Sequence, residues 1–202
     1  MGAAATIAVI AVVGYLLGSI NSAILVSRLT MGYDIRTKGS GNAGLTNAYR
    51  CMGGARTLAV LIGDVAKAAA ALSVGGALMG PMGKLIAGAF VIVGHVFPLY
   101  FGFRGGKGVL VGATMVGMFD WRILVILLTV FGILVAVTRW VSLGSVAGAA
   151  LFPVVTYLFY HDIPMLLMTA AMGGAVVYMH RSNLVRIAHG EENRFTLHGG
   201  KK

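Results

Sequence analysis

The sequence predicts an all-α integral membrane protein with seven membrane-spanning helices, and three observations support this prediction. Hydrophobic residues make up 58% of the 202-residue chain, whereas charged residues make up only 11%. The mean hydropathy of +0.88 is far above that of a soluble domain. Charges, prolines and glycine pairs cut the chain into apolar stretches of the length that a bilayer requires.

Each apolar stretch is interpreted as one span. A helix needs about 20 apolar residues, with a range of about 17–25, to cross the hydrocarbon core. The stretch 107–119 is shorter, so it must borrow flanking residues or cross where the bilayer is thin. Many of the 30 glycines lie inside these stretches, where they allow helices to approach closely. The seven predicted spans are 3–27, 55–79, 84–103, 107–119, 122–138, 143–160 and 163–180.

The lysines and arginines predict an outer N-terminus and a cytoplasmic C-terminus. With this orientation, the outer loops hold only Lys84 and Arg122, and all other loop cations are on the inner side. The net charge of +10 is therefore a signal of topology and of an anion site. Membrane lipids are expected partners, and a nucleic-acid partner is not, because the chain has no soluble basic face with interleaved aromatic residues.

The first polar cluster contains the glycine-rich segment Gly39–Gly44, which matches the pattern G-x-G-x-x-G. No strand precedes it, so a dinucleotide site is excluded. Glycines still allow backbone N–H groups to face a phosphate, and Arg50 can bind one with two hydrogen bonds. A short helix beginning at Asn42 would place Asn42, Thr46 and Arg50 on one face, with Asn47 beside them. The alternative is an ordinary polar loop with a helix cap.

The second polar cluster surrounds Lys107, which lies among three glycines. It is no Walker A loop, because glycine rather than serine or threonine follows the lysine. A lysine in such a loop can approach an anion as a point charge. His95, at the start of this cluster, is either a ligand contact or a hydrogen-bonded packing residue. The three glycines are Gly105, Gly106 and Gly108.

Two further clusters lie in the second half of the chain. Ser142 and Ser145 are three residues apart and could cap a helix or bind substrate. His180 and Asn183 are one helical turn apart and can face the same site. The chain is expected to form one polytopic domain, 1–202, whose signature loops converge at the cytoplasmic face: 28–54, 94–108, 139–145 and 180–192.

One charged pair lies inside the second span. Asp64 and Lys67 are three residues apart, and buried charges are costly in a membrane. A mutual ion pair is expected, either as a structural element or as part of the site. Cys51 is the single cysteine, which excludes an internal disulfide. No metal is expected, because the carboxylates and histidines form no ligand set.

Three segments resemble the signature blocks of the bacterial acyl-phosphate-dependent glycerol-3-phosphate acyltransferases, the PlsY family. They are Gly39–Asn47 with Arg50, Gly94–Gly108 and His180–Glu192. The resemblance implies a seven-helix inner-membrane enzyme without a cofactor. It would transfer a fatty acyl group from acyl phosphate to glycerol 3-phosphate and so form lysophosphatidic acid and inorganic phosphate.

The residue patterns and the resemblance together predict roles for individual residues. The expected catalytic residues are Ser40, Arg50, Lys107, His180 and Asn183. The expected substrate-binding residues are Gly39, Gly41, Asn42, Thr46, Asn47, His95, Gly105, Gly106, Gly108, Ser142 and Ser145. The expected structural residues are Asp64, Lys67 and Glu192.

The mechanistic hypothesis assigns the acyl phosphate to the backbone amides of residues 39–42 and to Ser40. Arg50 and Lys107 would neutralise phosphate charge, while His180 and Asn183 would orient the glycerol hydroxyl. Either His180 or a substrate phosphate could accept the proton.

Two alternatives differ in class or donor. An anion transporter would also need cations in a helical bundle, but it would place its site near the midplane between repeats, whereas these clusters gather at one face. An acyltransferase that uses thioesters would carry a histidine followed at the fifth position by aspartate. No histidine of this sequence has that partner.

Overall fold

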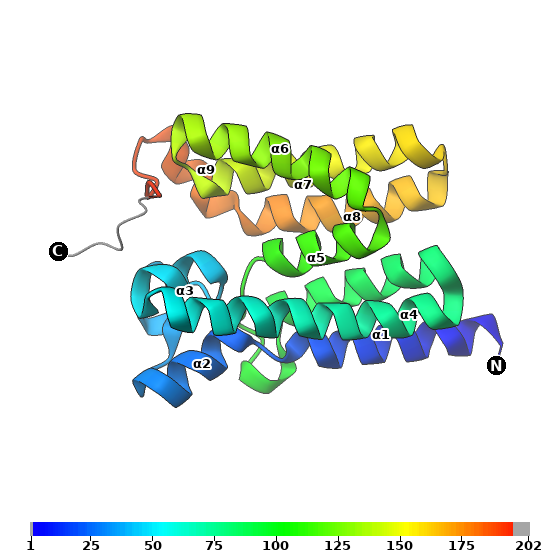
Figure 1. Ribbon diagram of the computed structural model, residues 1–202, viewed down its shortest axis with the longest axis horizontal. Helices are drawn as coiled ribbons and strands as arrows, with labels where there is room; N and C mark the ends of the chain where they lie inside the picture. The colour runs from blue at the N-terminus through cyan, green and yellow to red at the C-terminus, as the bar shows by residue number, and fades with distance from the viewer. Residues whose placement is uncertain (1, 196–202) are drawn as a thin grey trace. The chain divides into compact units, whose positions relative to one another are not determined.

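The computed structural model describes residues 2–195, and within that range every regular element is a helix (Figure 1). The all-α prediction is therefore confirmed. The chain divides into two compact units at Phe119 and Asp120. The α-helices of the first unit are α1 (Ala3–Ser19), α2 (Ser22–Met31), α3 (Leu45–Met52), α4 (Gly54–Val96) and α5 (Val109–Phe119), with the 3₁₀ turns η1 (Ile35–Thr37) and η2 (Leu99–Phe101).

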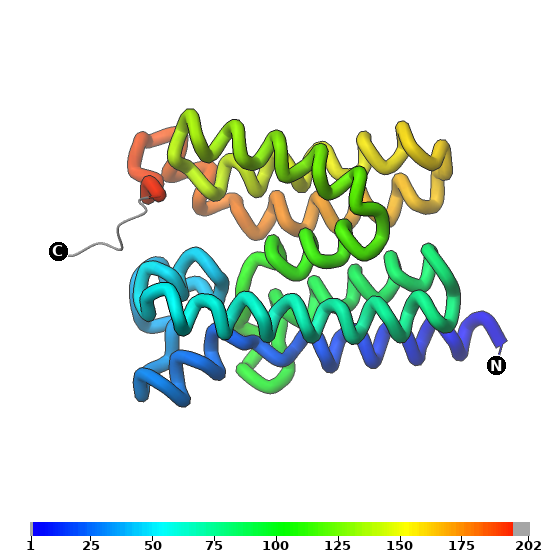
Figure 2. The backbone as a smooth tube through the Cα atoms, viewed as in Figure 1, coloured from blue at the N-terminus to red at the C-terminus, as the bar shows by residue number. Residues whose placement is uncertain are grey.

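Helix α4 is a hairpin rather than one straight helix. Its helical geometry is interrupted at Met79 and Gly80, and the backbone tube reverses direction there (Figure 2). Gly80 has φ of 57°, a left-handed conformation that glycine adopts without steric cost. The two arms then pack so closely that a Cβ on Gly75 would overlap the carbonyl oxygen of Gly83. This contact fits the expected use of glycine between membrane helices.

Helix α1 packs along the second arm of α4 through the same kind of contact. A Cβ on Gly18 would lie 2.8 Å from the Val91 Cα, and a Cβ on Gly94 would lie 2.8 Å from the Ser19 nitrogen. The backbones can approach closely only because these positions lack side chains. The glycines of the apolar stretches thus bring the end of α4 next to the end of α1.

The predicted span 3–27 lies within one candidate span, Ala3–Met31, whose helix breaks after Ser19. A new helix begins at Ser22, and the Asn21 side chain caps it by accepting a hydrogen bond from the Ile24 nitrogen at 3.0 Å. Asparagine is among the residues that favour this capping position. The buried Asn21 side chain also donates to the Ala43 carbonyl at 3.3 Å, so the break anchors the first glycine loop.

The second unit contains three antiparallel apolar helices and a short polar one. They are α6 (Trp121–Thr138), α7 (Val141–Tyr160), α8 (Ile163–Met179) and α9 (Arg181–Ala188). Close contacts at Gly144 and Gly173 bring α6 and α8 against α7. Helix α9 bends away from α8 by 54°.

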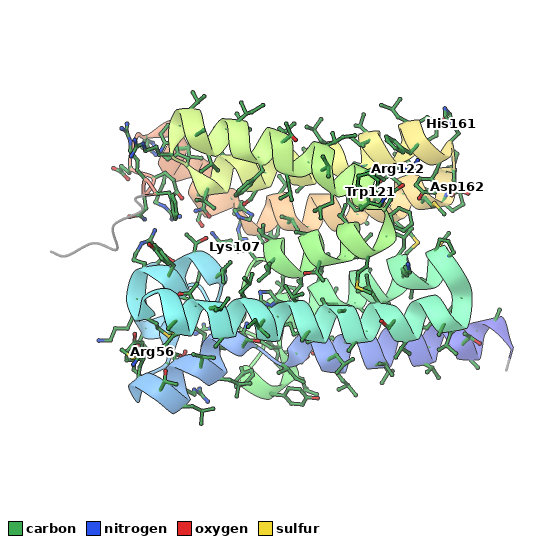
Figure 3. All side chains as sticks on the ribbon, in the orientation of Figure 1. Arg56, Lys107, Trp121, Arg122, His161 and Asp162 are labelled. Carbon is green, nitrogen blue, oxygen red and sulfur yellow. The ribbon has the colours of Figure 1, made fainter. Side chains whose placement is uncertain are left out.

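The turns at one end of the second unit carry a group of aromatic and charged side chains. Trp121, Arg122, His161 and Asp162 lie together there (Figure 3). Asp162 accepts a hydrogen bond from the Met165 nitrogen at 2.7 Å and so caps α8. The hydrogen bond from Arg122 lowers the pKa of Asp120, the cap of α6, to about 2.

Length and composition identify four candidate spans among the described residues, or five if the bent pair α8 and α9 forms one span. The four are Ala3–Met31, Gly54–Phe101, Trp121–Thr138 and Val141–Tyr160. Helix α5 is apolar but has only 11 residues, in keeping with the short fourth stretch of the sequence. The protein is thus an all-α integral membrane protein, and the count of seven spans stays a prediction.

Candidate functional site

Helix α3 presents part of the first polar cluster on an exposed face. It begins at Leu45, with Gly44 as its cap residue. The predicted helix start at Asn42 is therefore wrong, and Asn42 does not share a helical face with Thr46 and Arg50. Those two residues are exposed and lie one turn apart on α3.

Asn47 shapes the first glycine loop, residues 39–44. Its side chain is 1% exposed; its Oδ1 accepts from the Ser40 nitrogen at 2.9 Å, and its Nδ2 donates to the carbonyls of Lys38 and Asn42 at 3.0 Å each. Gly39 has φ of 58°, and a Cβ there would overlap the Asn47 oxygen. Asn47 thus holds the loop from beneath and leaves the Ser40 residue exposed above it.

Two amides of this loop already have partners. The Ser40 nitrogen donates to Asn47, and the Gly41 nitrogen donates to the Lys38 carbonyl at 3.0 Å. An acyl phosphate bound by these two amides, as the mechanistic hypothesis assumes, would compete with those bonds. The side chains around the loop are better placed than these amides to receive an anion.

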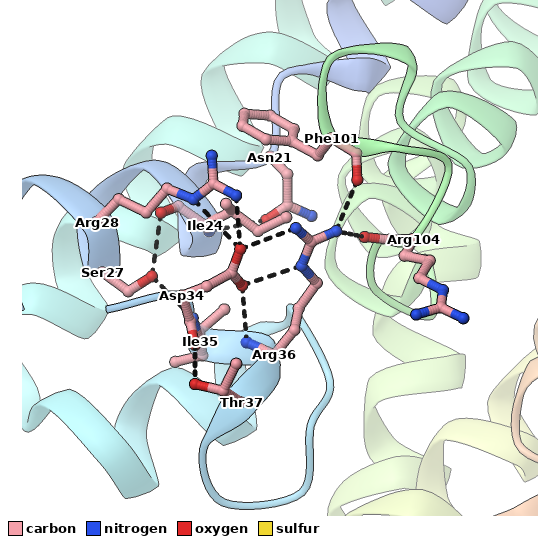
Figure 4. A network of polar contacts seen from close by, with 10 residues as sticks. All are labelled: Asn21, Ile24, Ser27, Arg28, Asp34, Ile35, Arg36, Thr37, Phe101 and Arg104. Carbon is pink, nitrogen blue, oxygen red and sulfur yellow. Dashed lines mark hydrogen bonds and ion pairs between the residues drawn. The ribbon is translucent and has the colours of Figure 1, made fainter. Parts of the chain in front are cut away.

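A network that the sequence interpretation missed joins the first cluster to the loop after α4 (Figure 4). Asp34 binds Arg28 and Arg36, with N–O distances of 2.7 and 2.8 Å. Arg36 also donates to the carbonyls of Phe101 and Arg104 at 2.6 and 2.8 Å. The hydrogen bond from Arg36 holds the pKa of Asp34 well below its usual range. An aspartate two residues before an arginine is a weak local signal, and it does not indicate the distant carbonyl partners.

The second glycine loop, residues 102–108, is folded against His95. The Gly105 nitrogen donates to the Val96 carbonyl at 3.0 Å, and the Gly106 nitrogen donates to the His95 carbonyl at 3.1 Å. A Cβ on Gly105 would overlap the His95 carbonyl oxygen, and a Cβ on Gly106 would overlap the His95 Nε2 atom. Glycine is therefore required here by close packing, and the loop presents the half-buried Lys107 next to it.

The predicted ion pair between Asp64 and Lys67 is present, with Nζ 2.8 Å from Oδ1. Lys67 Nζ also lies 3.0 Å from His95 Nδ1. All three residues are buried, and His95 is only 3% exposed. Of the two interpretations of His95, these contacts favour the hydrogen-bonded packing residue.

Glu192 organises the polar end of the second unit. Its Oε1 atom accepts from Ser142 Oγ at 3.0 Å and from Asn183 Nδ2 at 2.7 Å, while Oε2 accepts from Arg186 Nε at 2.8 Å. Burial alone would raise the pKa of Glu192, but the hydrogen bonds from Asn183, Arg186 and Ser142 outweigh it and lower the pKa. These contacts support the structural role expected for Glu192. Ser145 instead donates to the Val141 carbonyl of its own helix at 2.9 Å.

His180 lies at the bend between α8 and α9 and is 3% exposed. Its Nδ1 atom is 2.8 Å from the Val176 carbonyl oxygen. A carbonyl can only accept, so Nδ1 carries a hydrogen, and in the neutral ring the lone pair is then on Nε2. The His180 carbonyl also accepts from the Asn183 nitrogen at 2.9 Å, which fixes the two residues relative to each other.

Within residues 2–195, no group of three histidine, cysteine, aspartate or glutamate side chains could hold a metal ion.

The predicted site residues fall into two sets, one in each unit. The first unit carries Ser40, Thr46, Arg50 and Lys107, and the second carries Ser142, His180, Asn183 and Glu192.

A family model described as glycerol-3-phosphate acyltransferase matches residues 8–190. The glycerol-3-phosphate acyltransferase of Geobacillus kaustophilus is 37% identical over 185 residues, which cover 92% of this chain and 94% of the relative. That of Bacillus subtilis is 34% identical over 186 residues, which cover 92% of this chain and 96% of the relative.

Two crystal structures of PlsY, an integral membrane glycerol 3-phosphate acyltransferase, are similar to this chain. The glycerol 3-phosphate form has a TM-score of 0.88 and 28% identity, with 94% of this chain and 96% of the other covered. The lysophosphatidic acid form has a TM-score of 0.84 and 27% identity, with 94% and 95% covered.

Proposed function

The chain belongs to the glycerol-3-phosphate acyltransferase family, and from this premise we propose that its acyl donor is an acyl phosphate and that no covalent acyl-enzyme forms. The enzyme itself is an integral, multi-pass membrane acyltransferase of the PlsY type that produces lysophosphatidic acid. What is proposed is the donor, the roles of the residues and the membrane topology.

The choice of donor rests on the absence of the dyad that thioester-using acyltransferases require. The fifth residue after His180 is Val185, and no other histidine of the chain is followed there by aspartate. An acyl phosphate is a mixed anhydride, and phosphate is already a good leaving group. Positioning of two bound substrates and stabilisation of charge can then supply the rate enhancement.

Phosphate binding is assigned to the first unit. Arg50 projects from the exposed face of α3 and can form two parallel hydrogen bonds to a phosphate. Lys107 adds a point charge from the second glycine loop, which Arg36 ties to the first cluster. Ser40 and Thr46 add hydroxyl groups on the exposed side of the same cluster.

Activation of the acceptor is assigned to the second unit. The glycerol hydroxyl oxygen attacks the acyl carbonyl carbon, a new C–O ester bond forms, and the bond to the leaving phosphate breaks. The proton passes to His180 Nε2, which holds the lone pair in the neutral ring because Nδ1 donates to the Val176 carbonyl. Asn183, held by Glu192, orients the hydroxyl. The tautomer of His180 is the observation that favours this residue over a substrate phosphate as the proton acceptor.

We further propose seven crossings with an outer N-terminus in the cytoplasmic membrane. The reversal at Gly80 supports one crossing for each arm of α4, and the distribution of lysine and arginine supports the orientation. With this topology, the signature loops of each unit would lie on the cytoplasmic side.

The donor is tested with purified protein in lipid nanodiscs, palmitoyl phosphate or palmitoyl thioester, and labelled glycerol 3-phosphate. We expect lysophosphatidic acid only from palmitoyl phosphate. Product from the thioester alone would refute the proposed donor.

The phosphate site is tested with Arg50→Ala. Removal of a charge-assisted hydrogen bond costs about 1.5–3 kcal/mol, so the KM for glycerol 3-phosphate or for acyl phosphate should rise about 10- to 100-fold. Arg56→Ala is the matched control. Arg56 lies at the start of α4, donates to the carbonyl of Met52 at the end of α3, and has no proposed substrate role. Equal KM values in both variants would contradict the assignment of Arg50.

A further inference from the structure

A buried cluster of Asp64, Lys67 and His95 lies in the first unit beneath the two glycine loops. Nothing in the proposed chemistry uses these side chains. Burial of an ion pair in a membrane protein is costly, and the position of this pair at a junction of several segments suggests what it does.

Lys67 is surrounded by three acceptors. Its Nζ atom is 2.8 Å from Asp64 Oδ1, 3.0 Å from His95 Nδ1 and 2.5 Å from the carbonyl oxygen of Ile20, at the break between α1 and α2. A lysine ammonium has three N–H donors and no acceptor. The three distances therefore match one hydrogen bond from each N–H group.

This arrangement determines the state of the His95 ring. Because Nζ donates to Nδ1, Nδ1 must carry a lone pair, and the ring hydrogen must be on Nε2. A hydrogen on Nδ1 would place two donors 3.0 Å apart. His95 is thus a neutral hydrogen-bond donor on its Nε2 edge and cannot accept a proton from substrate at Nδ1.

The Nε2 edge faces the place where the two glycine loops meet. A Cβ on Gly106 would overlap His95 Nε2 and would lie 2.7 Å from the Ala43 carbonyl oxygen. The same Ala43 carbonyl accepts from Asn21, at the helix break that Lys67 also binds. Asp64 contributes a further contact to this break, because its Oδ1 accepts from the Ser22 nitrogen at 3.4 Å.

We propose that Asp64, Lys67 and His95 form a positioning triad, in which Lys67 locks His95 in the Nε2–H tautomer and the triad fixes the meeting point of Ala43 and Gly106. Lys107 directly follows Gly106, so the triad sets where this cation meets a phosphate. The inference rests on the proposed function only through this role of Lys107. The three residues act through the loops and are positioning residues, not catalytic ones.

The tautomer is tested in the wild-type protein, which needs no variant to fold. Histidine rings labelled with ¹⁵N are observed by NMR in lipid nanodiscs at neutral pH, and His95→Asn assigns the His95 signals by their loss. We expect an unprotonated Nδ1 and a protonated Nε2. A hydrogen on Nδ1, or a mixture of tautomers, would overturn the proposal.

Positioning is tested with the double variant Asp64→Asn/Lys67→Met, which removes both charges and so avoids a single buried charge. We expect a mixture of His95 tautomers and a rise of about 100-fold in the KM for glycerol 3-phosphate, with a smaller change in kcat. The matched control is Lys84→Met. Lys84 lies near the start of the second arm of α4, far along that arm from His95, and donates to the Met118 carbonyl. Unchanged tautomer and KM in the double variant would refute the triad.

Two further variants separate the possible failures. Gly106→Ala adds a methyl group that would clash with His95 Nε2 and the Ala43 carbonyl. It should therefore shift the His95 Nε2 signal and raise the KM for glycerol 3-phosphate, even if the double variant does not fold. If Lys107→Ala leaves the KM for glycerol 3-phosphate unchanged, the proposed phosphate role of Lys107 fails, whereas the ring measurement still decides whether the triad exists.

Discussion

Among residues 2–195, two histidines are buried, one in each unit, and as neutral rings they have opposite tautomers. In the first unit, a lysine ammonium occupies His95 Nδ1 and leaves a donor on Nε2. In the second unit, His180 Nδ1 donates to the Val176 carbonyl, so in the neutral ring the lone pair is on Nε2. Both residues are 3% exposed, so burial does not distinguish them. The partner of one ring nitrogen therefore decides whether the other nitrogen of a neutral histidine can act as a base.

The two units also differ in the groups that satisfy their buried charged side chains. The first unit satisfies a buried ion pair with backbone carbonyls and amides, while Arg50 lies on helix α3 and Lys107 on the second glycine loop. The second unit directs Ser142, Asn183 and Arg186 onto one carboxylate, Glu192. The first arrangement suits the binding of phosphate, and the second suits the orientation of a hydroxyl group.

The largest effect is expected for His180→Ala. Loss of a general base costs about 100- to 10,000-fold in rate, so kcat should fall by that factor while the KM for glycerol 3-phosphate changes little. Steady-state kinetics with palmitoyl phosphate measure both constants. His189→Ala, at the exposed end of α9, is the matched control. A near-normal kcat for His180→Ala would show that a substrate phosphate takes the proton, and the contrast between the histidines would then lose its catalytic meaning.

A smaller effect, on stability, is expected for Glu192→Gln. The folded protein lowers the pKa of Glu192 below its ordinary value of 4.5. The ionised form therefore contributes stability at every pH above about 4.5, and this contribution is lost as the pH falls from there through the lowered pKa. The variant should melt below the wild type at neutral pH, and the difference should shrink in acid.

Thermal melts followed by tryptophan emission test this expectation, because Trp140 is two residues from Ser142, a partner of Glu192. Glu191→Gln is the control, because the Glu191 side chain is exposed and is not one of the groups that bond in the Glu192 cluster. A gap between wild type and Glu192→Gln that is the same at all pH values would contradict the role assigned to the charge.

The smallest effect is expected for Ser145→Ala. Its hydroxyl already bonds to the Val141 carbonyl one turn earlier, an interaction that contributes little to a helix. Kinetic constants should change about twofold or less. Ser142→Ala should change them more, because it removes a donor to Glu192. A larger effect at Ser145 would restore the substrate contact that the sequence suggested for both serines.

Features that depend on neighbours along the chain could be predicted from the sequence. Composition and the spacing of charges predicted an all-α membrane protein, and the three-residue spacing of Asp64 and Lys67 predicted their ion pair. The glycine-rich blocks indicated the family. These inferences succeed because hydropathy, helical spacing and turn-forming residues act locally.

The hydrogen-bond partners of the polar side chains could not be predicted from the sequence, because they depend on which distant segments the fold brings together. Asn47 resembled a ligand residue until its amide was found to bond the loop beneath Ser40. His95 meets Lys67 from 28 residues away, and Arg36 reaches a carbonyl 65 residues away. Hydrogen-bond donors and acceptors are fixed in number, so the role of a polar side chain depends on which partners the fold brings to it. That is why the two histidines could be located from the sequence, while their opposite tautomers required the three-dimensional structure.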